Sequence, residues 1–176
     1  MNTPAIPDEP VLLVIGYGNT LRQDDSAGPR VAEHIEARGL PGLRTFACPQ
    51  LSPEHAEAVA RARVVVFVDA QAGAAGNVRL RRIAPGESSQ VTTHAAEPWT
   101  LLALARDVYG RVPLAWLLTI PAEQLGFGTD ITQVTRRGIE IAVGEVARLA
   151  GTLSVTRQAA TAQPSRTAPE EIRVFG

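Results

Sequence analysis

The sequence is poor in cysteine, in aromatic residues and in net charge. Its 176 residues include one cysteine, Cys48, so no disulfide can form within the chain, which is compatible with a reducing compartment. Aromatic residues make up 5% of the chain against 45% for apolar residues as a whole, so any core must be mostly aliphatic. The formal net charge is -1, so the chain does not have the excess of basic residues that is typical of a nucleic-acid-binding protein.

Long apolar runs are also missing. No stretch reaches the roughly 20 residues that cross a bilayer, and residues 1–10 lack the basic start and apolar middle of a secretory signal. We therefore expect a cytoplasmic protein with neither a membrane nor a nucleic-acid partner. No long exposed apolar seam is evident in the sequence, so we also expect a monomer. The length favours one domain over residues 11–150, after an N-terminal extension at 1–10. Residues 158–171 show no apolar periodicity, so we expect a flexible tail over 151–176.

Short apolar runs alternate with amphipathic segments along the chain. The runs at 11–15, 63–68 and 114–120 predict strands that are buried on both faces, and 43–48 and 78–83 are weaker strand candidates. Helical periodicity or capping signals fall between them, at 26–38, 53–62, 97–109 and 132–149. This alternation predicts an α/β fold with three α/β/α layers and a mostly parallel, roughly five-stranded twisted sheet.

A glycine-containing loop follows the first predicted strand, which suggests a dinucleotide-binding fold as one interpretation. Gly16 and Gly18 match the first two glycines of that fingerprint, but Leu21 stands where the third glycine belongs. The loop also carries Asp24 and Asp25, whose carboxylates would repel a pyrophosphate. The spacing therefore argues against nucleotide binding.

The same loop is suited to the delivery of acidic groups. Gly16 and Gly18 allow the backbone to turn after the strand, and the Asn19 side chain can hold such a turn. Asp24 and Asp25 then lie just before a helix. One of them can cap the helix and the other is free for chemistry, although both could equally be caps or surface acids.

Two further polar residues belong to the same predicted edge of the sheet. Asp69 ends the second buried run, and His94 lies in the loop before a later helix. Sites in open α/β sheets form beyond the carboxyl ends of the strands, so Asp25, Asp69 and His94 can converge there. Two oxygen donors and one nitrogen donor suit a divalent first-row metal with open positions. Taken alone, Asp69 could instead be a loop hydrogen-bonding residue and His94 an ordinary loop histidine.

Four segments, in this order, resemble the hydrogenase maturation proteases over roughly residues 11–150. They are the Gly-x-Gly-Asn and Asp-Asp motif, a strand ending in Asp-Ala, a Thr-Thr-His turn before a leucine-rich helix, and a Pro-x-Glu segment followed by Phe-Gly, which fall at 16–28, 65–70, 92–94 and 120–128. The chain departs from the family at Ser26, where many members have glycine, and at Asp25, where some have the longer glutamate.

The resemblance implies a phosphorylase/hydrolase-like fold and an endopeptidase that removes the C-terminal extension of a nickel-iron hydrogenase large-subunit precursor after nickel insertion. Asp25, Asp69 and His94 would be the catalytic residues and would contact nickel supplied by the substrate, with no tightly bound cofactor of the enzyme's own. We also expect substrate contacts at three loop residues, Gly18, Asn19 and Gly73.

Several alternatives stay open at this point. The same three ligands would serve a nickel metallochaperone without peptidase activity, and a non-peptidase α/β ligand-binding domain is a third interpretation. If the chain is a peptidase, either a metal-activated water or an aspartate acting as general base could drive hydrolysis. The paired Asp-Thr/Ser-Gly motifs of pepsin-type aspartic peptidases are absent from the sequence.

Overall fold

One six-stranded sheet forms the centre of the computed structural model, which describes residues 10–73, 76–86, 97–160 and 173–175. The strand order across the sheet is β2-β1-β3-β5-β4-β6. The strands are β1 (Leu12–Tyr17), β2 (Leu43–Cys48), β3 (Val64–Ala72), β4 (Val78–Ile83), β5 (Leu114–Ala122) and β6 (Arg173–Phe175). The helices are η1 (Gln23–Ser26), α1 (Ala27–Glu36), α2 (His55–Arg61), α3 (Pro98–Tyr109) and α4 (Gln133–Ala160).

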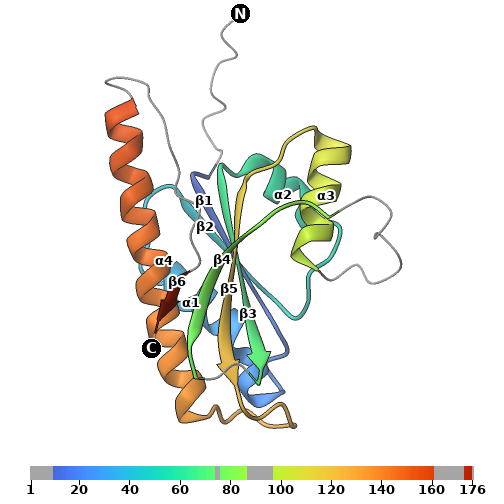
Figure 1. Ribbon diagram of the computed structural model, residues 1–176, viewed down its shortest axis with the longest axis vertical. Helices are drawn as coiled ribbons and strands as arrows, with labels where there is room; N and C mark the ends of the chain where they lie inside the picture. Colours follow the sequence, from blue (N-terminus) through green and yellow to red (C-terminus); the bar gives the residue numbers. More distant parts are fainter. Residues whose placement is uncertain (1–9, 74–75, 87–96, 161–172, 176) are drawn as a thin grey trace, which may run out of the picture.

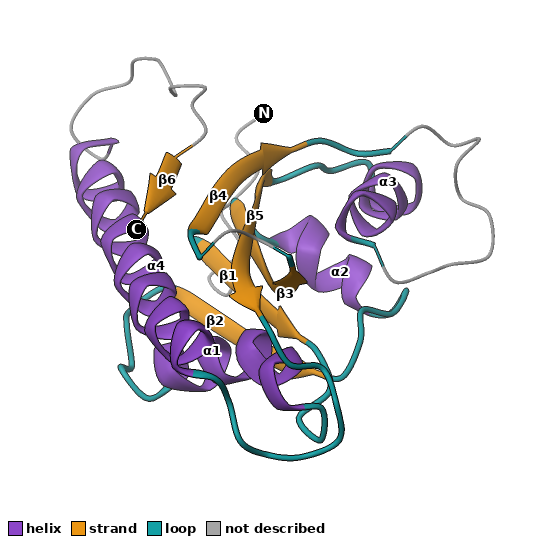
Figure 2. Ribbon diagram, turned by 60° about the horizontal axis from the view of Figure 1, so that its bottom comes forward, coloured by secondary structure: helices purple, strands orange, loops and turns teal. Residues whose placement is uncertain are grey.

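The helices cover both faces of the sheet. Figures 1 and 2 show α1 and α4 on one face and α2 and α3 on the other. β1, β2, β3 and β5 pair in parallel, whereas β4 runs antiparallel to β5 and to β6. The predicted three-layer α/β/α fold with a mostly parallel sheet is confirmed. Among the described helices, none combines the length and the apolar character that crossing a membrane requires.

Two apolar clusters lie on the two faces of the sheet. Alternate residues of β1 and β3, such as Val14 and Val66, pack into the cluster beneath α1 and α4. The residues between them, such as Ile15 and Phe67, pack into the cluster beneath α2 and α3. Both faces of these central strands are therefore buried, which explains why the sequence shows continuous apolar runs instead of alternation.

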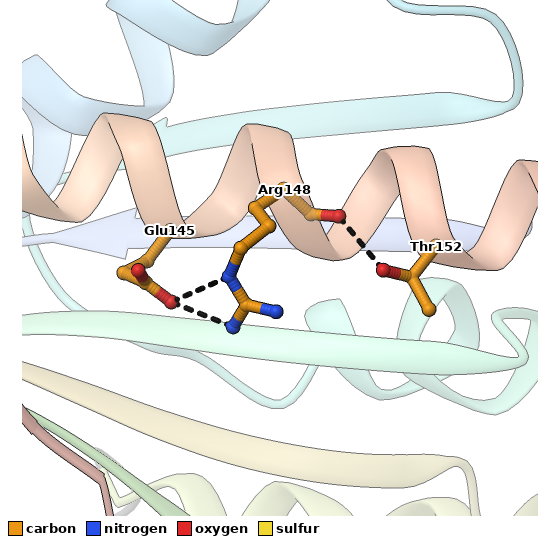
Figure 3. Close-up of polar contacts among 3 residues, drawn as sticks. All are labelled: Glu145, Arg148 and Thr152. Carbon is orange, nitrogen blue, oxygen red and sulfur yellow. Dashed lines mark hydrogen bonds and ion pairs between the residues drawn. The ribbon is translucent and has the colours of Figure 1, made fainter.

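Helix α4 is longer than the sequence predicts. We expected it to end at Leu149, but it continues to Ala160, because Leu149 and Leu153 extend its apolar stripe by one more i, i+4 step against the core. Its outer face is polar, with Arg148 paired to Glu145 over 2.7 Å (Figure 3). The domain boundary that we expected at residue 151 therefore falls inside a helix.

The C-terminal end of the chain adds a strand that the sequence analysis missed. β6 pairs antiparallel with the first half of β4, so that Val78 lies opposite Phe175. Three residues are too few for a periodic pattern to be recognised in a sequence. Residues 161–172 of the predicted tail, and residues 1–9 of the predicted extension, lie outside the described residues.

Candidate functional site

The start of α1 packs closely against the carboxyl ends of β1 and β3 because two residues at the contact, Gly16 and Gly28, have no side chain. A Cβ atom on Gly28 would lie 2.4 Å from the Tyr17 carbonyl oxygen and 2.5 Å from that of Val68, and a Cβ on Gly16 would lie 1.9 Å from the Gly28 oxygen. Real Cβ contacts are not this short, so these positions require glycine. The close approach fixes η1, and with it both loop aspartates, over the ends of the strands.

The loop before η1 is folded around the Asp25 carboxylate. Gly18 has a φ of 142°, in the region that favours glycine, and a Cβ there would lie 1.9 Å from the Asp25 carbonyl oxygen. The Asn19 backbone N–H donates to Asp25 Oδ2 over 2.8 Å, while Asn19 Oδ1 accepts from the Leu21 N–H over 2.9 Å. Within the described residues Asp25 Oδ1 accepts no hydrogen bond, so it is free to engage a ligand.

Asp24 has a different role from its neighbour. It is fully buried, and its two carboxylate oxygens accept the backbone N–H groups of Glu123, Gln124 and Thr132 at 2.7–2.9 Å and the Thr132 hydroxyl at 3.0 Å. Burial acts to raise the pKa of Asp24, but these hydrogen bonds outweigh it and hold the pKa below its ordinary value. Asp24 therefore stays ionised and ties the β5–α4 loop to the β1–α1 loop.

Asp69 lies in β3 where that strand leaves the core. The Tyr17 hydroxyl donates to Asp69 Oδ2 over 2.9 Å. Burial, with smaller contributions from the negative charges of Asp25 and Glu97, raises the pKa of Asp69 from 3.8 to about 6, against the lowering effect of Tyr17 and the Ala70 N–H. Such a carboxyl group exchanges its proton close to neutral pH, which is the property required of a general base or acid.

Tyr17 stays protonated beside this carboxylate. Burial raises the pKa of the Tyr17 hydroxyl above its ordinary value, and the charge of Asp69 adds to the effect, while that of Arg81 opposes it. Because the hydroxyl keeps its proton, it can donate to Asp69 Oδ2, and this hydrogen bond fixes the orientation of that carboxylate. The second carboxylate oxygen, Oδ1, accepts no hydrogen bond from another described side chain.

The structure brings together two of the three predicted catalytic residues. Asp25 and Asp69 lie at the carboxyl ends of neighbouring strands, close enough for the charge of one to raise the pKa of the other. His94, the third, lies outside the described residues, and so do its neighbours at 87–96. Among the residues that the structure describes, no three His, Cys, Asp or Glu side chains are grouped as metal ligands.

The predicted substrate-binding residues differ in exposure. Gly73 is exposed, has a φ of 72° and meets no atom within 4 Å of the position of a Cβ, so it lies at an open turn after β3. Asn19 is exposed beside Asp25, whereas Gly18 is buried and its N–H donates to the Cys48 carbonyl oxygen over 3.1 Å. Their contact with a substrate stays a prediction.

Sequence reasoning missed three residues around this site. Tyr17 is the last residue of β1 and lies on the same face of the strand as Leu13 and Ile15. The alternation of side chains along a strand could have placed it on the same face and edge of the sheet as Asp69. Glu97 precedes α3, and its charge acts on both Tyr17 and Asp69. Arg81 comes from β4, which no motif in the sequence connects to the site.

Fold and site together define an α/β/α protein with a carboxylate-rich site beyond the carboxyl ends of its parallel strands, the usual position for a site in such a sheet. The arrows of β3 and β5 in Figure 1 point to this edge. One carboxylate is oriented by a tyrosine and the other by a backbone N–H. This set can bind a metal ion through oxygen or can accept a proton from water.

The same fold occurs in solved structures of hydrogenase maturation endopeptidases. The chain is 22% identical to HybD of Escherichia coli, with a TM-score of 0.63 over 80% of this chain and 93% of that one. HycI of Thermococcus kodakarensis is 18% identical, with a TM-score of 0.62 over 82% and 95% of the two chains. HycI of Escherichia coli is 20% identical, with a TM-score of 0.58 over 76% and 87%. No protein-family model and no curated protein sequence matches the chain.

Proposed function

We propose that this chain is a hydrogenase maturation endopeptidase, which removes the C-terminal extension of a nickel-iron hydrogenase large-subunit precursor once nickel has been inserted. The observation that carries the proposal is the pairing of Asp25 with Asp69 at the sheet edge, where the pKa of Asp69 is raised to about 6. The fold shared with solved maturation endopeptidases and the order of the four sequence segments support it.

In this proposal the enzyme recognises the nickel of its substrate through oxygen ligands. Asp25 Oδ1 and Asp69 Oδ1 carry no hydrogen bond from another described side chain, while each Oδ2 is held in place, by the Asn19 N–H and the Tyr17 hydroxyl respectively. Orientation of a ligand by a second hydrogen bond is the usual arrangement around metal sites. His94 would complete the set as the nitrogen ligand.

Hydrolysis then needs a water that loses a proton next to the scissile carbonyl. Asp69 is suited to accept that proton, because its pKa of about 6 is closer to neutral pH than that of an ordinary carboxyl. Nickel bound in the substrate would itself lower the pKa of the water. We expect the enzyme to act in the cytoplasm, as a monomer and without a cofactor of its own.

Incubation of the purified protein with nickel-loaded and nickel-free precursor tests the proposal. We expect cleavage of the loaded form only, and loss of at least about 100-fold of the rate in Asp69→Asn, the size typical for loss of a catalytic proton acceptor. Asp107→Asn is the matched control, because Asp107 is exposed at the far end of α3, where it forms an ion pair with Arg106.

The outcomes separate the candidate functions. Normal cleavage by Asp69→Asn would show that Asp69 is not a catalytic residue. Cleavage of nickel-free precursor at the same rate would contradict recognition of the metal. Transfer of nickel to the precursor without a cut would instead support the metallochaperone, which uses the same ligands.

A further inference from the structure

A row of side chains crosses the sheet at the level of Asp69. Asp69 in β3 lies opposite Thr119 in β5, and Thr119 lies opposite Arg79 in β4. Partner residues of neighbouring strands point to the same face of a sheet, and successive strands lie about 4.8 Å apart. Arg79 is therefore on the face of Asp69, two strands away, within reach of a ligand that is bound there.

Arg81 follows on the same face. It lies opposite Leu117, which belongs to the cluster beneath α2 and α3. The positive charge of Arg81 also reaches the site directly, because it opposes the increase in the pKa of the Tyr17 hydroxyl. Two guanidinium groups thus flank the carboxylates of the site on the β4 side.

Within the part of the chain that the structure describes, neither guanidinium group has an anionic partner. Arg79 and Arg81 are exposed, and neither makes a hydrogen bond or an ion pair with any described residue. Neither arginine forms an ion pair with Asp25 or Asp69, whose Oδ2 atoms accept from the Asn19 N–H and the Tyr17 hydroxyl respectively. Unpaired arginines beside a binding site provide planar donor pairs that match a carboxylate.

We propose that Arg79 and Arg81 form a subsite that binds a carboxylate of the extension to be removed, and so select precursors with an acidic residue near the cleaved bond. The proposal rests on the proposed function and adds a specificity determinant to it. The site itself carries the acids Asp25, Asp69 and Glu97, whose charges would repel an acidic peptide. The two arginines offset that repulsion at one position only, so the extension binds in one orientation.

The same strand provides a matched control. Arg82 is exposed and equally unpaired among the described residues, but it lies opposite Trp116, which packs against the cluster beneath α1 and α4. Its side chain therefore points to the other face of the sheet. Arg82→Gln changes the net charge by the same amount as Arg81→Gln without altering the subsite.

The first measurement is binding and does not depend on cleavage. Rhodamine-labelled peptides of alternating Gly and Asp, or of Gly and Asn, are titrated with the protein and followed by fluorescence anisotropy. We expect the Asp peptide to bind more tightly, the double variant Arg79→Gln with Arg81→Gln to weaken its binding about fivefold or more, and added salt to reduce the difference. Equal binding of both peptides, or a loss in Arg82→Gln equal to the loss in the single variant Arg81→Gln, would overturn the subsite.

The second measurement is cleavage of the loaded precursor. The double variant should lower kcat/KM for a precursor with an acidic extension and change it little when the Asp and Glu side chains are replaced by Asn and Gln. If amidation of the C-terminus removes the effect instead, the bound group is the terminal carboxylate, and the selection of an acidic residue near the cleaved bond is refuted. If the wild-type protein cuts the precursor and the double variant cuts it equally well, the subsite is refuted but the endopeptidase activity is not. Peptide binding through Arg81 without any cleavage would refute only the endopeptidase.

Discussion

At the scale of single residues, Asp69 combines a functional position with a cost in stability. Its pKa is about 6 in the folded protein against an ordinary 3.8, so between these values the folded state holds a proton that the unfolded state has released. Stability therefore falls as the pH rises from about 4 to about 6 and stays lower above that range. A site that must hold ionised carboxylates close together is the place where such a cost is expected.

Asp69→Asn should therefore stabilise the protein while it abolishes cleavage. A change of two pKa units corresponds to nearly 3 kcal/mol, which we reduce to about 1–2 kcal/mol at pH 7 because water still reaches this side chain. At pH 4 both forms are neutral at this position and most of the gain should vanish. Urea unfolding of the two proteins at both pH values measures this. A variant that is less stable at pH 7 would contradict the assigned pKa.

Tyr17→Phe should shift the acidity of Asp69 in a known direction. The hydroxyl hydrogen bond lowers the pKa of Asp69, so its removal should raise that pKa above about 6. We expect the acidic limb of the cleavage rate to move to higher pH, and a carbon NMR titration of the Asp69 carboxyl to show the same shift. Tyr109→Phe is the control, since Tyr109 is exposed at the end of α3. An unchanged titration would mean that Tyr17 does not orient Asp69.

At the scale of secondary-structure elements, the contact between α1 and the strand ends depends on the absence of a side chain at residue 28. In Gly28→Ala the new Cβ would press on backbone oxygens of Tyr17 and Val68, which cannot rotate away. Overpacking of this kind costs about 1–3 kcal/mol, and we expect a lower midpoint of thermal unfolding and a displaced Asp25.

Substitution of a second glycine, Gly144, should have the opposite effect on stability. Gly144 is exposed within α4 and nothing lies within 4 Å of the position of its Cβ, so Gly144→Ala should stabilise the helix by about 0.5–1 kcal/mol. Equal effects of the two substitutions would show that α1 can move away from the sheet. The comparison thus separates close packing from a general effect of glycine.

The elements were predictable from the sequence because their patterns are local. The buried apolar runs follow from residues within a few positions of each other, and so does the position of Asp69 directly after the run of β3. The general rule for open α/β sheets then places Asp25 and Asp69 at one edge. The different roles of Asp24 and Asp25 could not be predicted. Both precede α1, and the partners of Asp24 lie about 100 residues further along the chain.

At the scale of the whole molecule, Asp24 joins two loops that are far apart in the sequence but lie at the same edge of the sheet. The loop between β1 and α1 and the loop between β5 and α4 meet through its carboxylate, and a second link forms where the Gln23 N–H donates to the Gly128 carbonyl oxygen over 2.9 Å. Helices α1 and α4, which follow these two loops, lie on the same face of the sheet (Figure 2). Loss of this carboxylate should therefore loosen both loops together.

Asp24→Asn should destabilise the protein by about 2–4 kcal/mol at pH 7, because an amide nitrogen then faces backbone donors and the charge that strengthens their hydrogen bonds is lost. The pKa of Asp24 lies below its ordinary value, so its contribution is present at neutral pH and is lost as the pH falls through that lowered pKa. Hydrogen exchange at the Glu123, Gln124 and Thr132 amides should accelerate in the variant. Asp25→Asn keeps an oxygen for the Asn19 N–H and should leave both stability and exchange nearly unchanged. If it destabilises the protein as much as Asp24→Asn does, the division of roles between the two neighbouring carboxylates is wrong.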